Sequence, residues 1–418
     1  MSRRPLVLVP QHFGSLVFDR RRSRYLPFDH AVTVRLREAI DLPLFSLPDG
    51  PALFEALEPS GFFDLNGRFD AEVVEAHPPA AHLLGPLAVH LEVIAACDLA
   101  CAHCFAGELP RKGALSLDAM EALFVELAAM GSFRLGLTGG EPLLRRDLLE
   151  IVDAATAQGL HPCLTTHGLH LDEHWAKELG RRDLMWLNVS LDGASAATHD
   201  RIRGPGTFDR AIEKIRLLSR HARFTLAFTI TTPLASEVEA CAKLAKALGA
   251  HTAVFRPLYP VGTAMAHLDL MPSYDAYADA LDRLAMWHPE SSDLHAIDPF
   301  SPQIRETLQA RTFVGKGCGA GTLIASVSSS GEVSPCSFLG PGAVAGRLDA
   351  ASFTQIWNES EGFTALRQLG CDGCGGFEGG CRARAQTFNG HLDAPDPWYE
   401  EWRARQDRHP STNVVVDR

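Results

Sequence analysis

The sequence lacks long apolar runs and lacks an excess of positive charge. No stretch approaches the roughly 18 consecutive apolar residues that a membrane-spanning helix needs. The 39 Lys and Arg residues are outnumbered by 51 Asp and Glu residues, for a net charge of −12, whereas nucleic-acid binding requires a basic face to neutralise phosphates. The N-terminal residues Met1 to Pro5 lead into too short an apolar stretch for a signal peptide. We therefore expect a cytoplasmic protein that binds neither membranes nor nucleic acids.

The composition is that of an ordinary globular protein, but its cysteines are unevenly placed. At 418 residues, 46% of them apolar, the chain is long enough for two or three domains. Its ten cysteines do not indicate a disulfide framework, because cytosolic thiols stay reduced. Cys163 and Cys241 stand alone in apolar contexts and are predicted to be buried core residues. The other eight form two groups that require a metal: Cys97, Cys101 and Cys104, then Cys318, Cys336, Cys371, Cys374 and Cys381.

Residues 1–80 are predicted to form a small module of their own. Three short β-type runs precede a helix that begins after Asp29, a typical N-cap residue. A second helix-like segment leads to Asn66-Gly67, a dipeptide typical of tight hairpins. This order indicates a winged-helix-like fold, and Pro78-Pro79 marks the linker that follows it. The β-type runs are residues 6–9, 16–18 and 24–28.

From residue 88 onward, strand-like and helix-like segments alternate. One helix with apolar residues at 3.6-residue spacing begins at the cap Ser116 and ends at Gly131. Such alternation predicts a parallel sheet with right-handed crossovers, and we expect an α/β fold built on a partial (β/α)6 barrel over residues 86–305. Its chemistry should gather at the carboxyl ends of the strands. Further helices are predicted at 147–158, 208–220 and 237–248, and strands at 89–94, 134–137, 162–165, 185–189, 224–230 and 252–255.

The strongest motif is Cys97-Asp98-Leu99-Ala100-Cys101-Ala102-His103-Cys104, directly after the first predicted strand of the barrel. Side chains of an extended strand alternate between two faces, so three thiolates this close in sequence converge only if the segment curls around a metal. Soft thiolates favour zinc or iron–sulfur clusters. A structural zinc site needs four ligands, whereas three thiolates suit a four-iron cluster with one iron left open for a small molecule.

A second motif, Thr138-Gly139-Gly140-Glu141-Pro142, follows the second predicted strand of the barrel. Paired glycines let the backbone approach a ligand closely, and Glu141 can accept hydrogen bonds from an ammonium group. Alone such a run is commonly just a turn into a helix, but its place one βα unit after the cysteine loop makes it specific. Other polar residues that end predicted strands or follow them are Thr166, Ser190, Asp192, Arg203 and Arg256.

With these two motifs, residues 88–265 resemble the radical S-adenosylmethionine (radical SAM) superfamily. The resemblance implies that Cys97, Cys101 and Cys104 hold a [4Fe–4S] cluster whose open iron binds the amino and carboxylate groups of S-adenosylmethionine. One electron would then cleave the sulfonium bond, and the 5′-deoxyadenosyl radical would abstract a substrate hydrogen. His167 replaces the Asn of the usual Thr-Asn-Gly run. The predicted cofactor-binding residues are Gly139, Gly140, Glu141, Pro142, Thr166, Ser190, Asp192, Arg203 and Arg256, and no catalytic residue beyond the cluster is assigned.

The C-terminal cysteines, in residues 306–418, resemble the SPASM or twitch extension of radical SAM enzymes, which carries auxiliary [4Fe–4S] clusters. A full SPASM domain has seven cysteines, and five are present here. The closing cysteine is absent, and Asp396-Pro397-Trp398-Tyr399 stands where it would be expected. We therefore expect one auxiliary cluster, held by Cys318 and Cys336 plus two of Cys371, Cys374 and Cys381. A zinc ribbon remains the structural alternative.

SPASM-type enzymes mostly modify peptides, so the resemblance implies a ribosomally made precursor peptide as substrate and a flavodoxin or ferredoxin as electron donor. Residues 1–80 resemble modules that bind a leader peptide by strand addition, although they could equally be a structural cap. Within the class, a tetrapyrrole substrate or a sulfatase-maturing activity remains an alternative, the latter disfavoured by Ser337 after Cys336, where those enzymes carry an acid. Outside it, the chain could be a non-catalytic zinc protein.

Overall fold

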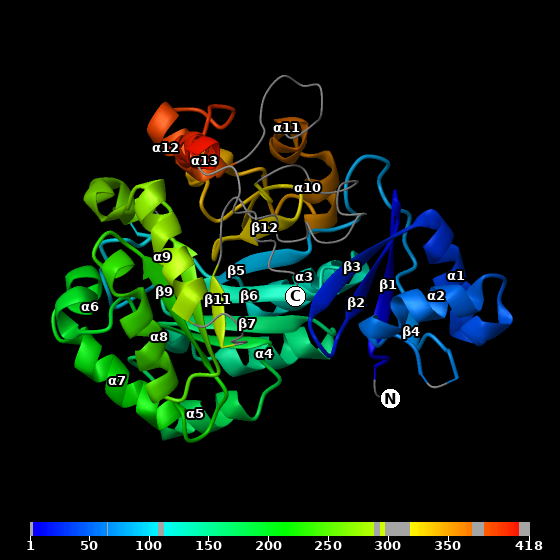
Figure 1. Cartoon of the computed structure of the whole chain (residues 1–418), viewed down its shortest axis with the longest axis horizontal. Coiled ribbons are helices and arrows are strands. Elements are labelled where there is room, and N and C mark those ends of the chain that lie inside the picture. Colours follow the sequence, from blue (N-terminus) through cyan, green and yellow to red (C-terminus); the bar gives the residue numbers. More distant parts are fainter. Residues whose placement is uncertain are drawn as a thin grey trace.

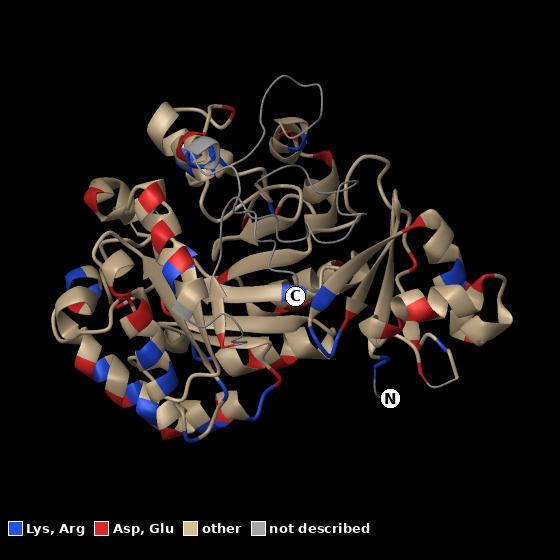
Figure 2. Cartoon of the chain, viewed as in Figure 1, with Lys and Arg blue, Asp and Glu red and all other residues tan. Residues whose placement is uncertain are grey.

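The computed structural model describes residues 3–64, 66–107, 113–287, 293–296, 318–369 and 380–408, and these form two sheets with helices packed against them (Figure 1). A four-stranded sheet has the order β3-β2-β1-β4, and a ten-stranded sheet has the order β11-β10-β9-β8-β7-β6-β5-β12-β13-β14. Charged residues lie mainly on the outer helices, and the strands of the large sheet carry few (Figure 2).

The four-stranded sheet belongs to the N-terminal region. Strands β1 (Leu6–Gln11), β2 (Gly14–Asp19) and β3 (Arg24–Asp29) are antiparallel neighbours, and β4 (Ala71–Val73) runs parallel to β1. The side chain of Asp29 accepts a 2.8 Å hydrogen bond from the backbone N–H of Val32, which confirms it as the N-cap of α1 (His30–Asp41). Helix α2 (Gly50–Leu57) follows, and Phe63 forms an antiparallel bridge to Phe69 across the predicted Asn-Gly hairpin.

The two faces of this sheet have different partners. On one face, Leu6, Leu8 and Val17 pack with residues of α1 in a small core. On the other face, Val9 and Phe18 belong to the main core of the protein. The N-terminal sheet is therefore joined to the large sheet by apolar packing, as well as by the linker that the sequence predicts.

The large sheet confirms the predicted α/β class. Seven parallel strands, β5 to β11, run from its centre to one edge, each hydrogen-bonded to the next along the chain. They are β5 (Ala88–Ile94), β6 (Arg134–Gly139), β7 (His161–Thr166), β8 (Trp186–Ser190), β9 (Thr225–Ile230), β10 (Thr252–Pro257) and β11 (Leu294–Ala296). The connecting helices are α3 (Leu117–Ala129), α4 (Leu148–Ala157), α5 (Glu173–Gly180), α6 (Ala196–Arg203), α7 (Thr207–Leu218), α8 (Val238–Ala247) and α9 (Tyr274–Trp287).

The C-terminal region extends the same sheet. Strand β12 (Ile324–Val327) pairs in parallel with β5, and β13 (Glu332–Ser334) and β14 (Gly346–Arg347) continue from it in antiparallel order. Four helices follow, and Figure 1 shows them on the side of β12. They are α10 (Phe353–Glu359), α11 (Glu361–Leu369), α12 (Arg382–Asn389) and α13 (Pro397–Arg408).

Candidate cluster and cofactor site

The three cysteines of the first motif lie in the loop that follows β5. Cys97 is exposed, Cys104 is half-buried and Cys101 is buried. The backbone N–H of Cys104 donates to the carbonyl of Cys101 (3.1 Å), and the carbonyl of Cys104 accepts from the N–H of Thr263 (2.9 Å). The segment therefore curls as the sequence predicts, and it is held against the loop that follows β10.

Gly139 and Gly140 hold the end of β6 directly against the start of this loop. A Cβ atom on Gly139 would lie 2.1 Å from the carbonyl oxygen of Ile94, and one on Gly140 would lie 2.0 Å from that of Ala96. The N–H of Gly140 donates to Ile94, and the next N–H donates to Ala96, both at 2.8 Å. Only glycine permits such an approach, so the paired glycines position the strand end beside Cys97.

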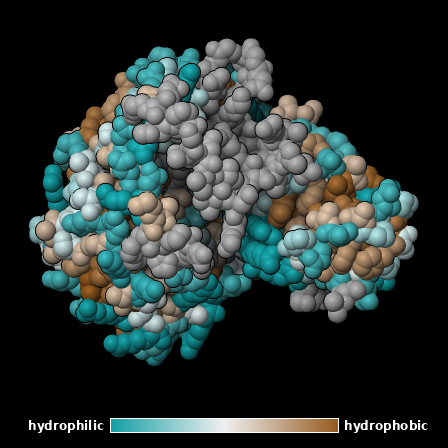
Figure 3. Space-filling model, in the orientation of Figure 1, coloured by the Kyte–Doolittle hydropathy of each residue, from teal (hydrophilic) through white to brown (hydrophobic). Residues whose placement is uncertain are grey.

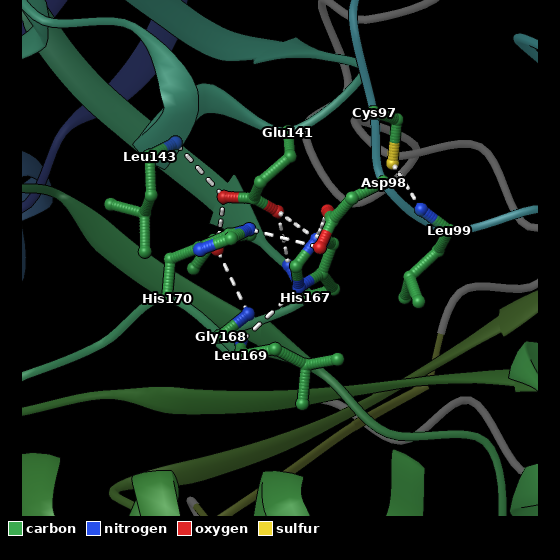
Figure 4. A network of polar contacts seen from close by, with 10 residues as sticks. Cys97, Asp98, Leu99, Glu141, Leu143, His167, Gly168, Leu169 and His170 are labelled. Atoms are coloured by element: carbon green, nitrogen blue, oxygen red, sulfur yellow. Dashed lines mark hydrogen bonds and ion pairs between the residues drawn. The ribbon is translucent and has the colours of Figure 1, made fainter. Parts of the chain in front are cut away.

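Glu141 is buried in a network that joins the ends of β6 and β7 (Figure 4). Its Oε1 accepts hydrogen bonds from the hydroxyl of Thr166 (2.6 Å) and the N–H of Leu143 (2.9 Å). Its Oε2 accepts from the N–H of His167 at 2.9 Å. The predicted residues Glu141 and Thr166 are thus in contact, and three donors of the chain hold the carboxylate in place.

His167, which replaces the Asn of the usual Thr-Asn-Gly run, connects the Glu141 network to the cysteine loop. Its Nδ1 accepts from the N–H of Leu169 (3.1 Å), so its proton lies on Nε2, which is 2.9 Å from Oδ1 of Asp98. Nε2 of His170 lies 3.0 Å from the other oxygen of Asp98. Cys97, Asp98 and His167 each place a possible metal-ligand atom within 4.8 Å of the others. Sequence analysis assigned no role to Asp98 or His170.

Asp192 organises a second buried group at the end of β8. Its Oδ2 accepts from Nε of Arg203 (2.6 Å) and lies 2.7 Å from Nε2 of His103, and its Oδ1 accepts from the N–H of Thr229 (2.9 Å). Burial alone would raise the pKa of Asp192, but the charge of Arg203, together with the contacts to His103 and Thr229, outweighs it and holds that pKa well below its usual range. The structure therefore brings Asp192 and Arg203 together with the cysteine loop, through His103.

Two observations indicate that the site can hold an iron–sulfur cluster together with a polar ligand. Its donor set is three thiols on one loop, which are soft ligands that suit iron. Nδ1 of His103 is buried and has no hydrogen-bond partner among the described residues, so it can accept from a ligand. Burial raises the pKa of the Cys101 thiol to about 11, and iron binding would therefore displace its proton.

Three of the five C-terminal cysteines can be placed. Cys318, Cys336 and Cys381 belong to one apolar cluster together with Val261 and Phe105. Burial, followed by the nearby Cys318 and Cys381, raises the pKa of the Cys336 thiol. Cys371 and Cys374 lie outside the described residues.

Asp396 begins the run of four residues that stands where the closing cysteine was expected, and its carboxylate contacts the backbone of Cys381. Its Oδ2 accepts a 2.6 Å hydrogen bond from the backbone N–H of Cys381. Both of its oxygens also accept from the guanidinium of Arg384, at 2.6 Å each, and both side chains are fully buried. The carboxylate is thus a structural support for Cys381.

Comparisons with known proteins agree with this geometry. Residues 91–246 match the family model of the radical SAM superfamily, and residues 318–375 match that of an iron-sulfur cluster-binding domain, SPASM. No helix among the described residues is long and apolar enough to cross a membrane.

Two relatives and one solved structure illustrate the similarity. The mycofactocin maturase MftC of Mycobacterium tuberculosis is 32% identical over 327 residues, which cover 75% of this chain and 82% of the relative. The AdoMet-dependent heme synthase of Methanosarcina barkeri is 30% identical over 75% of this chain and 96% of its own length. Streptococcus suis SuiB bound to its precursor peptide SuiA aligns with a TM-score of 0.74 at 13% identity, covering 95% of this chain and 99% of SuiB.

Proposed function

The chain is an enzyme of the radical SAM superfamily, and from that membership we propose that it modifies a ribosomally made precursor peptide. The observation that carries the proposal is the N-terminal sheet. SuiB was solved with a bound precursor peptide, and its fold aligns with 95% of this chain. A sheet whose edge strand has no pairing partner among the described residues, in the same chain as a radical SAM domain, supports the same substrate class.

We assign the cofactor residues as the sequence suggests. Cys97, Cys101 and Cys104 would hold the [4Fe–4S] cluster, and S-adenosylmethionine would bind beside it. When bound, these groups supply an electron and the 5′-deoxyadenosyl radical that abstracts a substrate hydrogen. The proposed residues around S-adenosylmethionine are Gly139, Gly140, Glu141, Pro142, Thr166, Ser190, Asp192 and Arg203.

The chain's own residues have two tasks in this assignment. The contacts among Asp98, His167 and Glu141 fix the cysteine loop to the ends of β6 and β7, and they would hold its three thiols in place for a cluster. The pair of Asp192 with Arg203 keeps a buried carboxylate ionised and orients His103. We also propose one auxiliary cluster held by Cys318, Cys336 and two of the remaining three cysteines, a flavodoxin or ferredoxin as electron donor, and a cytoplasmic location, where thiols stay reduced.

The edge of the N-terminal sheet supports peptide docking by strand addition. Strand β3 is an edge strand, and its Pro27 is a residue that sheets tolerate at edges. Exposed apolar side chains lie on α1, which begins directly after β3, and on the residues that follow it, and Figure 3 shows apolar surface on this part of the molecule. Val34 and Leu42 are each 52% exposed and Phe45 is 46% exposed.

Two arginines that precede β3, Arg21 and Arg22, already contact groups of the chain itself. Arg21 is bound to the carboxylate of Asp19 and to the carbonyl of Gly61, and Arg22 donates to the carbonyl of Ser60. We therefore place peptide contacts on the strand edge and the apolar residues, because these arginines already satisfy groups of the chain itself.

The test is to co-express the enzyme with short peptides encoded beside its gene and to measure their mass. We expect a mass change for one peptide, and we expect Val34→Glu with Leu42→Glu to weaken binding of that peptide about tenfold, because exposed sites tolerate the charge while a docked apolar segment does not. Val125→Glu is the matched control, since Val125 is 53% exposed on α3. Equal peptide binding by all variants, or turnover of a tetrapyrrole and of no peptide, would refute the proposal.

A tetrapyrrole is the second candidate substrate because a relative that is 30% identical is a heme synthase. The same purified enzyme can be incubated with tetrapyrroles and S-adenosylmethionine, and a change in the mass of a tetrapyrrole can be sought by mass spectrometry.

A further inference from the structure

Phe338 lies between the two groups of cysteines and contacts both. Its backbone N–H donates a 3.5 Å hydrogen bond to Sγ of Cys336, and its side chain packs in the apolar cluster of the C-terminal cysteines. The same ring meets the ring of Phe105 edge to face, with centroids 5.0 Å apart. Phe105 directly follows Cys104 of the first motif. One side chain therefore connects a C-terminal cysteine with the cysteine loop after β5.

The second ring contact of Phe338 is with the loop that follows β10. We call residues 258–263 of this loop the bridging loop. Its Tyr259 stacks on Phe338, with ring centroids 4.0 Å apart and ring planes 14° apart. The next carbonyl, that of Pro260, accepts a 2.8 Å hydrogen bond from the hydroxyl of Thr387 on α12. This end of the bridging loop is therefore held by the C-terminal region.

The other end of the bridging loop is held by the first cysteine motif. The N–H of Thr263 donates to the carbonyl of Cys104 at 2.9 Å. Gly262 has a φ of +61°, and a Cβ atom there would lie 2.5 Å from the carbonyl oxygen of Phe105 and 2.6 Å from that of Cys104. The two backbones thus touch at a position that requires glycine. Only two residues separate Gly262 from Tyr259.

Phe338 thus reaches Cys104 by two routes, directly through Phe105 and indirectly through the bridging loop. Protein interiors are close-packed and transmit small displacements. Metal binding orders the segment that supplies the ligands, so a cluster bound by Cys336 would fix the backbone of Phe338 two residues away. Without that cluster the ring would be held less firmly, and so would the loop that carries Cys104.

We propose that Phe338 is a positioning residue that couples the C-terminal cysteine group to the first cysteine loop. A cluster held by Cys336 would fix the Phe338 ring, and the ring would hold Cys104 in the position that favours binding of S-adenosylmethionine. This inference rests on the proposed assignment of both cysteine groups to clusters and is independent of the substrate.

The test is a double-mutant cycle on the reconstituted full-length enzyme. The readouts are the dissociation constant for S-adenosylmethionine, the iron content, and the change that S-adenosylmethionine causes in the spectrum of the reduced enzyme. We expect Phe338→Leu and Cys336→Ala each to weaken S-adenosylmethionine binding about fivefold. The double variant should bind no more weakly than either single variant, because both changes break the same connection.

Two further variants separate positioning from a general structural effect. Phe338→Tyr keeps an aromatic ring and should bind S-adenosylmethionine as the native enzyme does, and Phe338→Leu should keep its iron although its affinity falls. Phe388→Leu is the matched control, since it makes the same substitution at a side chain 42% exposed on α12. Affinity is measured directly because a fivefold loss is overcome at saturating S-adenosylmethionine.

Circular dichroism checks the folding of each variant. If Phe338→Leu does not fold, Tyr259→Leu takes its place in the cycle, because it removes the same stack from the side of the bridging loop.

Three results would overturn the inference. These are native affinity in Phe338→Leu or in Cys336→Ala, an equal loss of affinity in Phe338→Tyr and Phe338→Leu, and single effects that multiply to about 25-fold in the double variant. Failure of the cluster assignment itself has a different signature, because the native enzyme would then bind no S-adenosylmethionine.

Discussion

Asp98, the residue after the first cluster cysteine, has its Oδ1 2.9 Å from Nε2 of His167 at the end of β7. Burial lowers the pKa of His167, so its imidazole is neutral at pH 7 and donates the hydrogen bond. The backbone N–H of the same histidine donates a hydrogen bond to Oε2 of Glu141. One residue therefore ties the cysteine loop to the Gly-Gly-Glu strand end.

We expect Asp98→Ala to loosen this loop and to weaken S-adenosylmethionine binding about tenfold, because the loop must hold three thiols in one geometry. The readouts are the dissociation constant for S-adenosylmethionine and the spectrum of the reduced cluster. His170→Ala is the control, since His170 contacts the other oxygen of Asp98 and its side chain is 34% exposed. An Asp98→Ala enzyme with native affinity and an unchanged spectrum would show that the contact has no positioning role.

Replacing Cys97, Cys101 and Cys104 together by Ala should abolish reductive cleavage of S-adenosylmethionine while the protein still folds. These cysteines lie in a loop, and only Cys101 among them is buried, so the core loses little. Release of 5′-deoxyadenosine under dithionite measures cleavage, and circular dichroism measures folding. Continued release by the triple variant would refute the radical assignment.

Asp396→Asn should destabilise the C-terminal region, because it removes the carboxylate charge that faces the fully buried guanidinium of Arg384. Removing one member of a buried ion pair costs about 3–5 kcal/mol. We also expect the loss of about one cluster of iron, since Asp396 supports the backbone of Cys381. Iron analysis and limited proteolysis are the measurements, and Asp393→Asn, at a side chain 65% exposed, is the control. Native iron content and proteolysis in Asp396→Asn would contradict this role.

Cys336→Ala should lower the iron content by about one cluster, whereas cleavage of S-adenosylmethionine in the absence of substrate should largely survive. Cys336 lies in the apolar cluster with Cys318 and Cys381, away from the strand-end network of Glu141. Iron content and 5′-deoxyadenosine release, measured on the same sample, separate the two sites. Unchanged iron would mean that this thiol is no cluster ligand.

Acidification should weaken the contact between the N-terminal sheet and the barrel. Nδ1 of His161 lies 2.6 Å from the hydroxyl of Ser23, and burial, followed by the charge of Arg20, lowers the pKa of His161 to about 4. A detached histidine would titrate near its ordinary value of about 6.5. Protons therefore bind the detached form first, and the contact should lose up to about 1.4 kcal/mol per pH unit between 6.5 and 4.

Hydrogen exchange at the backbone amide of Phe133 reports this contact, because that N–H donates to the hydroxyl of Tyr25. His161→Gln should flatten the pH dependence, since glutamine does not titrate. A pH dependence of equal slope in the variant would assign the effect to other groups.

The sequence by itself determined the features that depend on neighbouring residues. Asp29 and Ser116 were recognisable as N-caps because a cap bonds to an N–H only three residues away. The cysteine spacing and the Gly-Gly-Glu run indicated the family for the same reason, since each motif is complete within a few residues. The eight-residue helices α5 and α6 escaped notice because so short a segment shows little periodicity.

Only the tertiary structure decided which distant segments meet. Strand β12 joins the sheet beside β5, although more than 200 residues separate them in the chain. Asp98 finds His167, and Asp396 supports Cys381 in place of a missing cysteine. Such contacts depend on strand order and on the packing of side chains in three dimensions, whereas hydrophobic periodicity and capping residues describe only what lies within one or two turns of chain.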